Sequence, residues 1–154
     1  MIHTEFNAKY NNYTAQYNQP FSLGEPDKEW QKVFEVAEAA LDNAMATLKP
    51  GITLQELTRS FHTPIDEAGL KSIRPVFHGL GLTSEEPLAS TAPGTSCIPS
   101  DSFPVKAGMV FEFEPHVITP DMKKGLTLGY PVLVTDKGCR SLSKSKLEVK
   151  IIRN

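Results

Sequence analysis

The sequence predicts an α+β domain in which helices cover one face of a curved, largely antiparallel sheet. Three observations support this fold class: polar and apolar residues alternate near the N-terminus, two amphipathic stretches follow, and the second half consists of short strand-like segments. A chain of 154 residues is long enough to bury a sizeable core. We therefore expect residues 1–154 to form a single domain.

A β-hairpin is predicted at the start of the chain. Residues 2–9 and 13–23 alternate polar residues with apolar or aromatic ones, as strands with one buried face do. Asn11 and Asn12 stand between them, and asparagine tolerates the left-handed backbone conformation that a tight hairpin turn requires.

Two helices are predicted after the hairpin. Asp27 is a favourable N-cap for the first helix, which ends before Pro50. Thr53 and Glu56 have the spacing of a capping box at the start of the second. Pro64 is expected to kink or shorten this second helix, because proline lacks the backbone N–H that a helix interior uses.

Strand patterns return in the second half of the chain. Residues 74–82, 109–118, 125–136 and 147–152 are predicted to form strands. The polar, proline-bearing stretch from Thr83 to about Lys106 is predicted to be a loop.

Composition excludes several classes of partner. With 16 Lys+Arg against 18 Asp+Glu, the net charge of -2 offers no electrostatic footprint for nucleic acid or an anionic membrane. No apolar run approaches the roughly 18 residues that a transmembrane helix needs, and no signal peptide is recognisable. Cys97 and Cys139 are expected to be free thiols, so we predict a cytoplasmic protein without nucleic-acid or membrane partners.

Four motifs occur in a fixed order along the chain. They are KPGIT at 49–53, HGLGL at 78–82, GMVFEFEP at 108–115 and VLVTDKG at 132–138. Together they resemble the methionine aminopeptidase, creatinase and Xaa-Pro dipeptidase family over about residues 5–145. The resemblance implies a partial pita-bread fold, namely the C-terminal part of an aminopeptidase-like catalytic domain.

The family holds two divalent metal ions with two aspartates, one histidine and two glutamates. The resemblance places the histidine at His78, one glutamate at Glu114 and the first aspartate at Glu5. The second aspartate and the last glutamate, which bridge the metals in the family, correspond to Gln16 and Gly129. Since two divalent ions repel each other strongly unless anions bridge them, a dinuclear site is not expected.

A site for one metal ion is the alternative, so the expected cofactor is either none or one divalent ion. Residues i and i+2 of a strand share a face, so Glu112 is expected beside Glu114. Together with His78 and Glu5 they form a candidate set for a single Mn, Zn, Fe or Co ion, with His116 as a further candidate. The simpler interpretation is a hydrogen bond between His78 and Glu114 without metal.

The family's second histidine, which holds substrate and moves protons, corresponds to Glu85. The candidate catalytic residues are therefore His78, Glu85 and Glu114. Three functions remain open: a metallopeptidase-family domain with altered or no hydrolase activity, a non-catalytic peptide- or protein-binding module, and an active Xaa-Pro peptidase. A peptide is the expected ligand. A homo-oligomer is also expected, because the first hairpin would leave an unpaired sheet edge.

Overall fold

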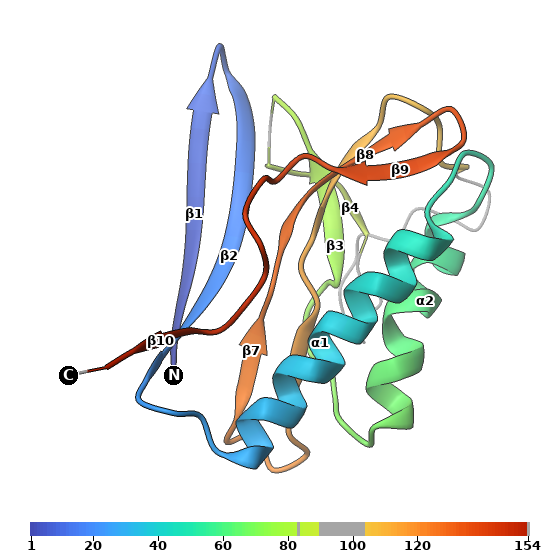
Figure 1. Cartoon of the computed structure of the whole chain (residues 1–154). Helices are drawn as coiled ribbons and strands as arrows, with labels where there is room; N and C mark the ends of the chain where they lie inside the picture. Colours follow the sequence, from blue (N-terminus) through green and yellow to red (C-terminus); the bar gives the residue numbers. More distant parts are fainter. Residues whose placement is uncertain (83, 90–103, 154) are drawn as a thin grey trace.

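The computed structural model describes residues 1–82, 84–89 and 104–153. Within these ranges the chain forms a hairpin, two helices and then short strands, arranged in three sheets (Figure 1). The α+β class predicted from the sequence is confirmed. Neither described helix combines the length and apolarity that a membrane crossing needs.

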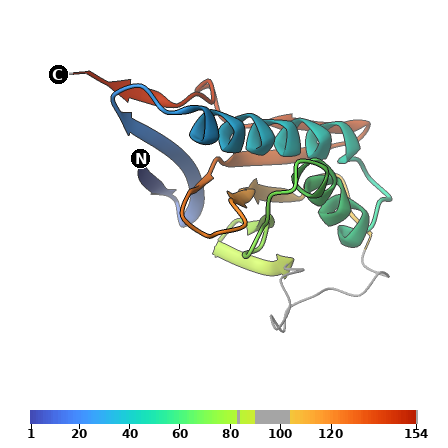
Figure 2. The same ribbon diagram turned by 90° about the horizontal axis from the view of Figure 1, so that it is seen from below.

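The N-terminal hairpin consists of β1 (Ile2–Tyr10) and β2 (Tyr13–Leu23), as predicted. Asn11 and Asn12 have φ angles of 47° and 66°, which are the left-handed values that a two-residue turn requires. A third strand, β10 (Lys150–Ile152), pairs with β2 in parallel, so this small sheet is mixed rather than antiparallel. The hairpin lies at the opposite end of the molecule from the second helix (Figure 2).

The two helices are α1 (Lys28–Thr47) and α2 (Leu54–Glu67). Asp27 caps α1, because its Oδ1 atom accepts hydrogen bonds from the N–H groups of Glu29 and Trp30, each at 3.0 Å. Thr53 and Glu56 form the predicted capping box of α2. Both helix starts therefore follow from short-range signals in the sequence.

Pro64 does not shorten α2, so this part of the prediction was wrong, while the alternative of a kink stays a prediction. Proline has no N–H, so the carbonyl of Ser60, four residues earlier, lacks its usual helical donor. The side-chain amide of Asn43 in α1 donates to that carbonyl at 2.7 Å. A bond from the neighbouring helix thus replaces the missing one, and the helix continues to Glu67.

A five-stranded antiparallel sheet forms the centre of the domain. Its strands, in spatial order, are β4 (Ser84–Ala89), β3 (Phe77–Leu80), β5 (Val110–Phe113), β8 (Tyr130–Thr135) and β9 (Gly138–Ser141). The predicted loop after Thr83 was therefore wrong at its beginning. A polar sequence becomes strand β4 there because it pairs with β3.

Two long predicted strands are each divided in the structure. Pro115 has no N–H for a central ladder, and the chain leaves the five-stranded sheet there. The segments beyond the breaks, β6 (His116–Ile118) and β7 (Gly125–Thr127), pair with each other as a two-stranded sheet. Gly129, just before β8, forms an antiparallel bridge with Asn18 and so joins the hairpin to the centre of the domain.

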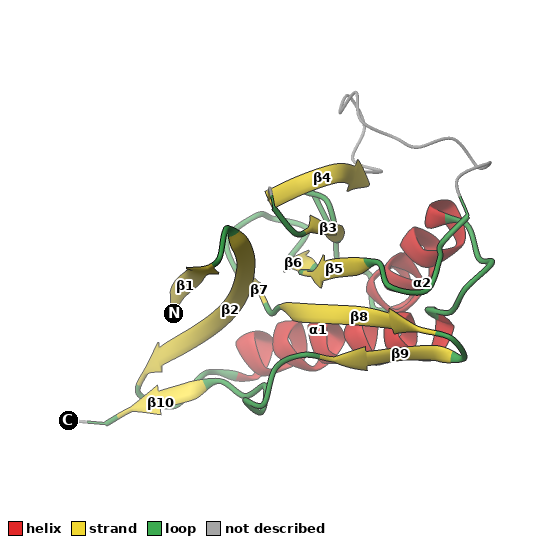
Figure 3. Ribbon diagram, turned by 90° about the horizontal axis from the view of Figure 1, so that it is seen from above, coloured by secondary structure: helices red, strands yellow, loops and turns green. Residues whose placement is uncertain are grey.

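The apolar core lies between the helices and the sheet. Both helices are on the same side of the strands (Figure 3). The ring of Phe61 from α2 lies 4.9 Å from Phe113 and 5.9 Å from Phe77, measured between ring centroids. Phe111 packs edge-on to Phe77, and all four rings are buried. This side of β5 is therefore aromatic, while Glu112 lies on the other side together with the half-buried Val110.

Candidate functional site

Polar side chains converge on the side of β5 that faces away from the helices. Glu112 alternates with Phe111 and Phe113 along the strand, and His78 of β3 stands directly opposite it in the register. Gln16 and Asn18 reach the same region from β2. These side chains are buried although they are polar: Gln16, Asn18, His78, Glu112 and Glu114.

Glu114 is the centre of this cluster. Its Oε2 atom accepts hydrogen bonds from the amide of Gln16 at 3.0 Å and from the amide of Asn18 at 3.4 Å. Its Oε1 atom lies 3.6 Å from Nε2 of His78 and 4.0 Å from Nε2 of His116. Two neutral amides and two imidazoles therefore surround one carboxylate.

The backbone fixes the orientation of the His78 ring. Nδ1 lies 2.8 Å from the carbonyl oxygen of Gly79, and because a carbonyl can only accept, we assign the ring proton to Nδ1. In the neutral ring, Nε2 then directs a lone pair toward Glu114. A proton on the His78 ring or on the Glu114 carboxyl group, or a cation between them, would allow the two side chains to interact directly.

Glu112 is the most unusual residue of the site. Its side chain has no exposed surface, and neither carboxyl oxygen has a hydrogen-bond partner among the described residues. Burial raises the pKa of Glu112 to about 10, and the negative charges of Glu114 and Glu5 act in the same direction. Glu112 therefore holds its proton at neutral pH.

The space beside Gly129 is already filled. A Cβ atom there would lie 2.6 Å from the carbonyl oxygen of Phe113, 2.7 Å from Nδ2 of Asn18 and 3.0 Å from Oε1 of Glu112. Position 129 thus has no room for the family's glutamate. A carboxyl group from the neighbouring strand, that of Glu112, lies against it instead.

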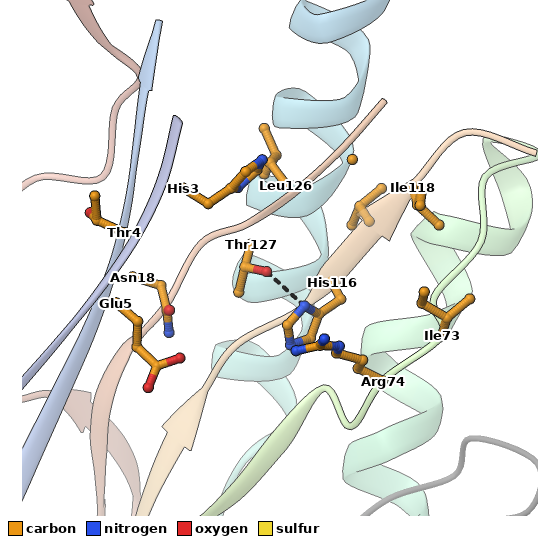
Figure 4. Close-up of a pocket in the computed structure, with 12 residues that line it drawn as sticks. His3, Thr4, Glu5, Asn18, Ile73, Arg74, His116, Ile118, Leu126 and Thr127 are labelled. Atoms are coloured by element: carbon orange, nitrogen blue, oxygen red, sulfur yellow. Dashed lines mark hydrogen bonds between the residues drawn. The ribbon is translucent and has the colours of Figure 1, made fainter. Parts of the chain in front are cut away.

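Two adjoining cavities open at this site. The smaller, of about 200 Å³, is lined by Glu5, Gln16, Arg74, Pro75, His78, Glu114 and His116. The larger, of about 360 Å³, shares Glu5, Arg74 and His116 with it and adds an apolar wall that includes Ile73, Ile118 and Leu126 (Figure 4). Glu112 lines neither cavity and stands behind them.

His116 and Arg74 both line the larger cavity but differ in charge at neutral pH. His116 is held by Thr127, whose Oγ1 lies 2.6 Å from Nδ1 (Figure 4). Burial lowers the pKa of His116 to about 4, assisted by the positive charge of Arg74, so this ring is neutral at pH 7. The guanidinium of Arg74 forms neither an ion pair nor a hydrogen bond with any residue that the structure describes.

The sequence-predicted site residues are only partly brought together. Glu5 lines both cavities, but its carboxylate accepts a hydrogen bond from Asn7 at 2.9 Å on its own strand. Glu85 belongs to β4, and its side chain lies outside the described part of the chain. Sequence reasoning missed Asn18 and Arg74. Asn18 shares a strand face with Gln16, and that spacing would have identified it.

A model of metallopeptidase family M24 matches residues 1–136. The chain belongs to this family. It is 31% identical over 136 residues to an uncharacterized peptidase of Staphylococcus saprophyticus, covering 87% of this chain and 37% of that protein. The M24 chain thus spans little more than a third of the length of the curated relatives it matches.

Solved structures of peptidases share the fold of this M24 chain, which confirms the predicted aminopeptidase-like layout. A dipeptidase from Pyrococcus horikoshii has a TM-score of 0.79 at 25% identity, over 96% of this chain and 40% of that one. Dipeptidase PepE from Mycobacterium ulcerans has a TM-score of 0.80 at 21% identity, over 97% of this chain and 39% of that one. The X-Pro aminopeptidase of Thermotoga maritima has a TM-score of 0.79 at 24% identity, over 97% of this chain and 41% of that one.

The donor set does not fit the two-metal centre of M24 enzymes. Gln16 supplies an amide and Gly129 has no side chain, so neither offers a bridging carboxylate. In the described ranges, no three His, Cys, Asp or Glu side chains stand close enough to hold a metal ion. Asn7 donates a hydrogen bond to Glu5, and Glu112 lies against Gly129. The single-metal set of His78, Glu112, Glu114 and Glu5 therefore stays a prediction.

Proposed function

We propose that this M24 domain binds the end of a peptide in the two joined cavities and has altered or no hydrolase activity. The observation that carries the proposal is the pair of amide hydrogen bonds from Gln16 and Asn18 to Glu114. Neutral donors satisfy this carboxylate where the family resemblance calls for cations held by bridging acids. The site therefore keeps a shaped polar cavity without the groups that activate a metal-bound nucleophile.

A short peptide complements the charges of the cavities. Arg74 offers a terminal carboxylate a cation that no described residue pairs with, and a guanidinium binds carboxylates with two parallel hydrogen bonds. Ile73, Ile118 and Leu126 would contact an apolar side chain of the ligand. Glu5, on the other side of the cavity, would face the terminal ammonium. Dipeptidases among the solved relatives point to the same ligand class.

Hydrolysis with a single metal ion is the second candidate function. The observation that favours it is the 3.6 Å separation of Nε2 of His78 from Oε1 of Glu114, two atoms of kinds that ligate divalent metals. A conventional Xaa-Pro peptidase is the third candidate and the least supported, since Gln16 and Gly129 remove both bridging carboxylates. We also propose a cytoplasmic location, with which the free thiol of Cys139 agrees, and self-association of the chain.

Peptide binding and cleavage measured in parallel test the proposal. With Mn²⁺, Co²⁺ or Zn²⁺ present, we expect no cleavage of Met-Xaa or Xaa-Pro dipeptides, and calorimetry should detect their binding. Arg74→Gln should weaken binding about 10- to 100-fold, the effect of losing a charged hydrogen bond.

Arg59→Gln is the matched control, because Arg59 is on exposed α2 surface away from both cavities. Binding that Arg74→Gln leaves unchanged would contradict the carboxylate assignment. Metal-dependent turnover that disappears in His78→Ala would instead establish the single-metal hydrolase.

A further inference from the structure

Three of the described residues line both cavities and therefore stand where the cavities join. They are Glu5, Arg74 and His116. The proposed peptide ligand would engage Arg74 through its carboxylate and Glu5 through its ammonium group. That pairing leaves His116 at the junction with no group of the ligand assigned to it.

The His116 ring is held on one side by the neighbouring strand. Its Nδ1 atom lies 2.6 Å from Oγ1 of Thr127 (Figure 4). The two residues stand directly opposite each other in the register of β6 and β7, so their side chains are on the same face. Backbone pairing thus fixes both ends of this contact, and with it the orientation of the ring.

The other ring nitrogen, Nε2, faces the site. It lies 4.0 Å from Oε1 of Glu114, which is longer than a hydrogen bond. No residue in the described ranges forms a hydrogen bond with Nε2. The side chain is 20% exposed, and it borders both cavities. A ligand at the junction can therefore reach Nε2.

The surroundings of His116 favour a proton on Nε2. A threonine hydroxyl can donate or accept, so Thr127 alone leaves both tautomers possible. The Glu114 carboxylate lies on the Nε2 side, and its negative charge attracts an N–H dipole and repels a lone pair. Thr127 then donates to Nδ1. His78 has the opposite arrangement, because its Nδ1 donates to the carbonyl of Gly79.

We propose that the Nε2–H group of His116 donates a hydrogen bond to the carbonyl oxygen of the ligand's peptide bond. His116 is then a specificity-determining residue of the two cavities, a role that rests on the proposed peptide binding. A dipeptide carries an ammonium group, a peptide carbonyl and a carboxylate, one for each of Glu5, His116 and Arg74. A free amino acid has both charges but no peptide carbonyl.

Three ligands of equal charge test this role by calorimetry on the unaltered chain. They are the dipeptide Leu-Leu, its (E)-alkene isostere, which lacks the carbonyl and the N–H, and its depsipeptide, which lacks only the N–H. Loss of one hydrogen bond should make the isostere bind about 3- to 10-fold more weakly than Leu-Leu. The depsipeptide is the control and should bind nearly as well as Leu-Leu, because it keeps the carbonyl.

Substitutions of His116 supply the other half of the experiment. His116→Phe keeps a ring but has no donor, so it should bind all three ligands equally, at the weaker affinity. His116→Gln carries an N–H donor at a similar distance from the backbone and should restore the preference for Leu-Leu. His116→Asn is the matched control, since its shorter amide does not reach the Nε2 position.

Nitrogen chemical shifts give a readout without any ligand. In the unaltered chain they should show the His116 proton on Nε2, and Thr127→Val should reduce the population of this tautomer, because valine cannot donate to Nδ1. A proton found on Nδ1 in the unaltered chain would overturn the proposal.

The binding results separate this inference from the proposed function. If the unaltered chain bound none of the three ligands, the proposed function would fail and the role of His116 with it. If Leu-Leu bound but the isostere bound equally well, only the role of His116 would be overturned. The same holds if the depsipeptide were weakened as much as the isostere, or if His116→Phe kept the preference for Leu-Leu.

Discussion

On strand β5, Phe111 and Phe113 on one face and Glu112 on the other are all buried, although their chemistry is opposite. On the helix side, Phe111 and Phe113 pack against other aromatic rings, and their burial stabilises the fold. On the other side, Glu112 is buried without a hydrogen-bond partner among the described residues, which costs roughly 1–3 kcal/mol. A strand face that lowers stability indicates a role in binding or chemistry, since apolar residues of similar size would fold better.

The largest expected effect is on the aromatic face. Phe113→Ala should lower the free energy of unfolding by about 3–5 kcal/mol, because it removes a fully buried ring and leaves a cavity against Phe61. Leu142→Ala, at a position 40% exposed, is the control and should change stability by much less. Urea denaturation measures both. If Phe113→Ala lowered the free energy of unfolding by less than about 1 kcal/mol, aromatic packing on the helix side of β5 would contribute little to stability.

The stability of the fold should depend on pH because of Glu112. The pKa of Glu112 is about 10 in the folded chain against an ordinary 4.5, so between these values the folded state binds more protons than the unfolded state. Stability should therefore fall as pH rises through this window, by up to about 1.4 kcal/mol per pH unit.

Glu112→Gln removes this titration while keeping the shape of the side chain. The variant should match the unaltered chain near pH 5 and exceed its stability by up to about 4 kcal/mol near pH 8, which is three pH units at about 1.4 kcal/mol each. Urea denaturation at several pH values gives the difference. Parallel stability curves for the two proteins would mean that Glu112 is already ionised and paired.

The smallest expected effect is at Gly129, which lies against both Phe113 and Glu112. Gly129→Ala should cost at least about 1 kcal/mol, because its Cβ would lie 2.6 Å from the Phe113 carbonyl oxygen. Gly138→Ala is the matched control, since a Cβ there meets no atom within 4 Å. Equal unfolding midpoints for the two variants would show that the backbone yields at position 129 and that a glutamate could be restored there.

Local signals predicted the fold better than the site. Asn11-Asn12, Asp27 and the Thr53–Glu56 capping box act within a few residues, so the hairpin and both helix starts could be predicted. Strand β4 could not, because its polar sequence becomes a strand only by pairing with β3. The broken strand at Pro115 shows the same dependence on which neighbour supplies a backbone partner.

The site depends on contacts between distant parts of the chain. Motif resemblance located His78, Glu114 and Gln16, and Gln16 does contact Glu114 although 98 residues separate them. Strand periodicity placed Glu112 on the same side as His78, but it could not show that the carboxyl group would settle against Gly129. No sequence pattern pointed to Arg74, whose importance arises only from the cavity around it.

The proline in α2 determines how the two helices are aligned. The Ser60 carbonyl can receive the amide of Asn43 only when α2 has one rotation about its axis and one height along α1. Phe61 follows directly in the sequence, so the same rotation aims its ring at Phe113. Pro64, a residue type that ordinarily interrupts helices, thus helps to fix the position of α2 relative to α1. Sliding one helix past the other would leave a carbonyl without a donor and withdraw an aromatic ring from the core at the same time.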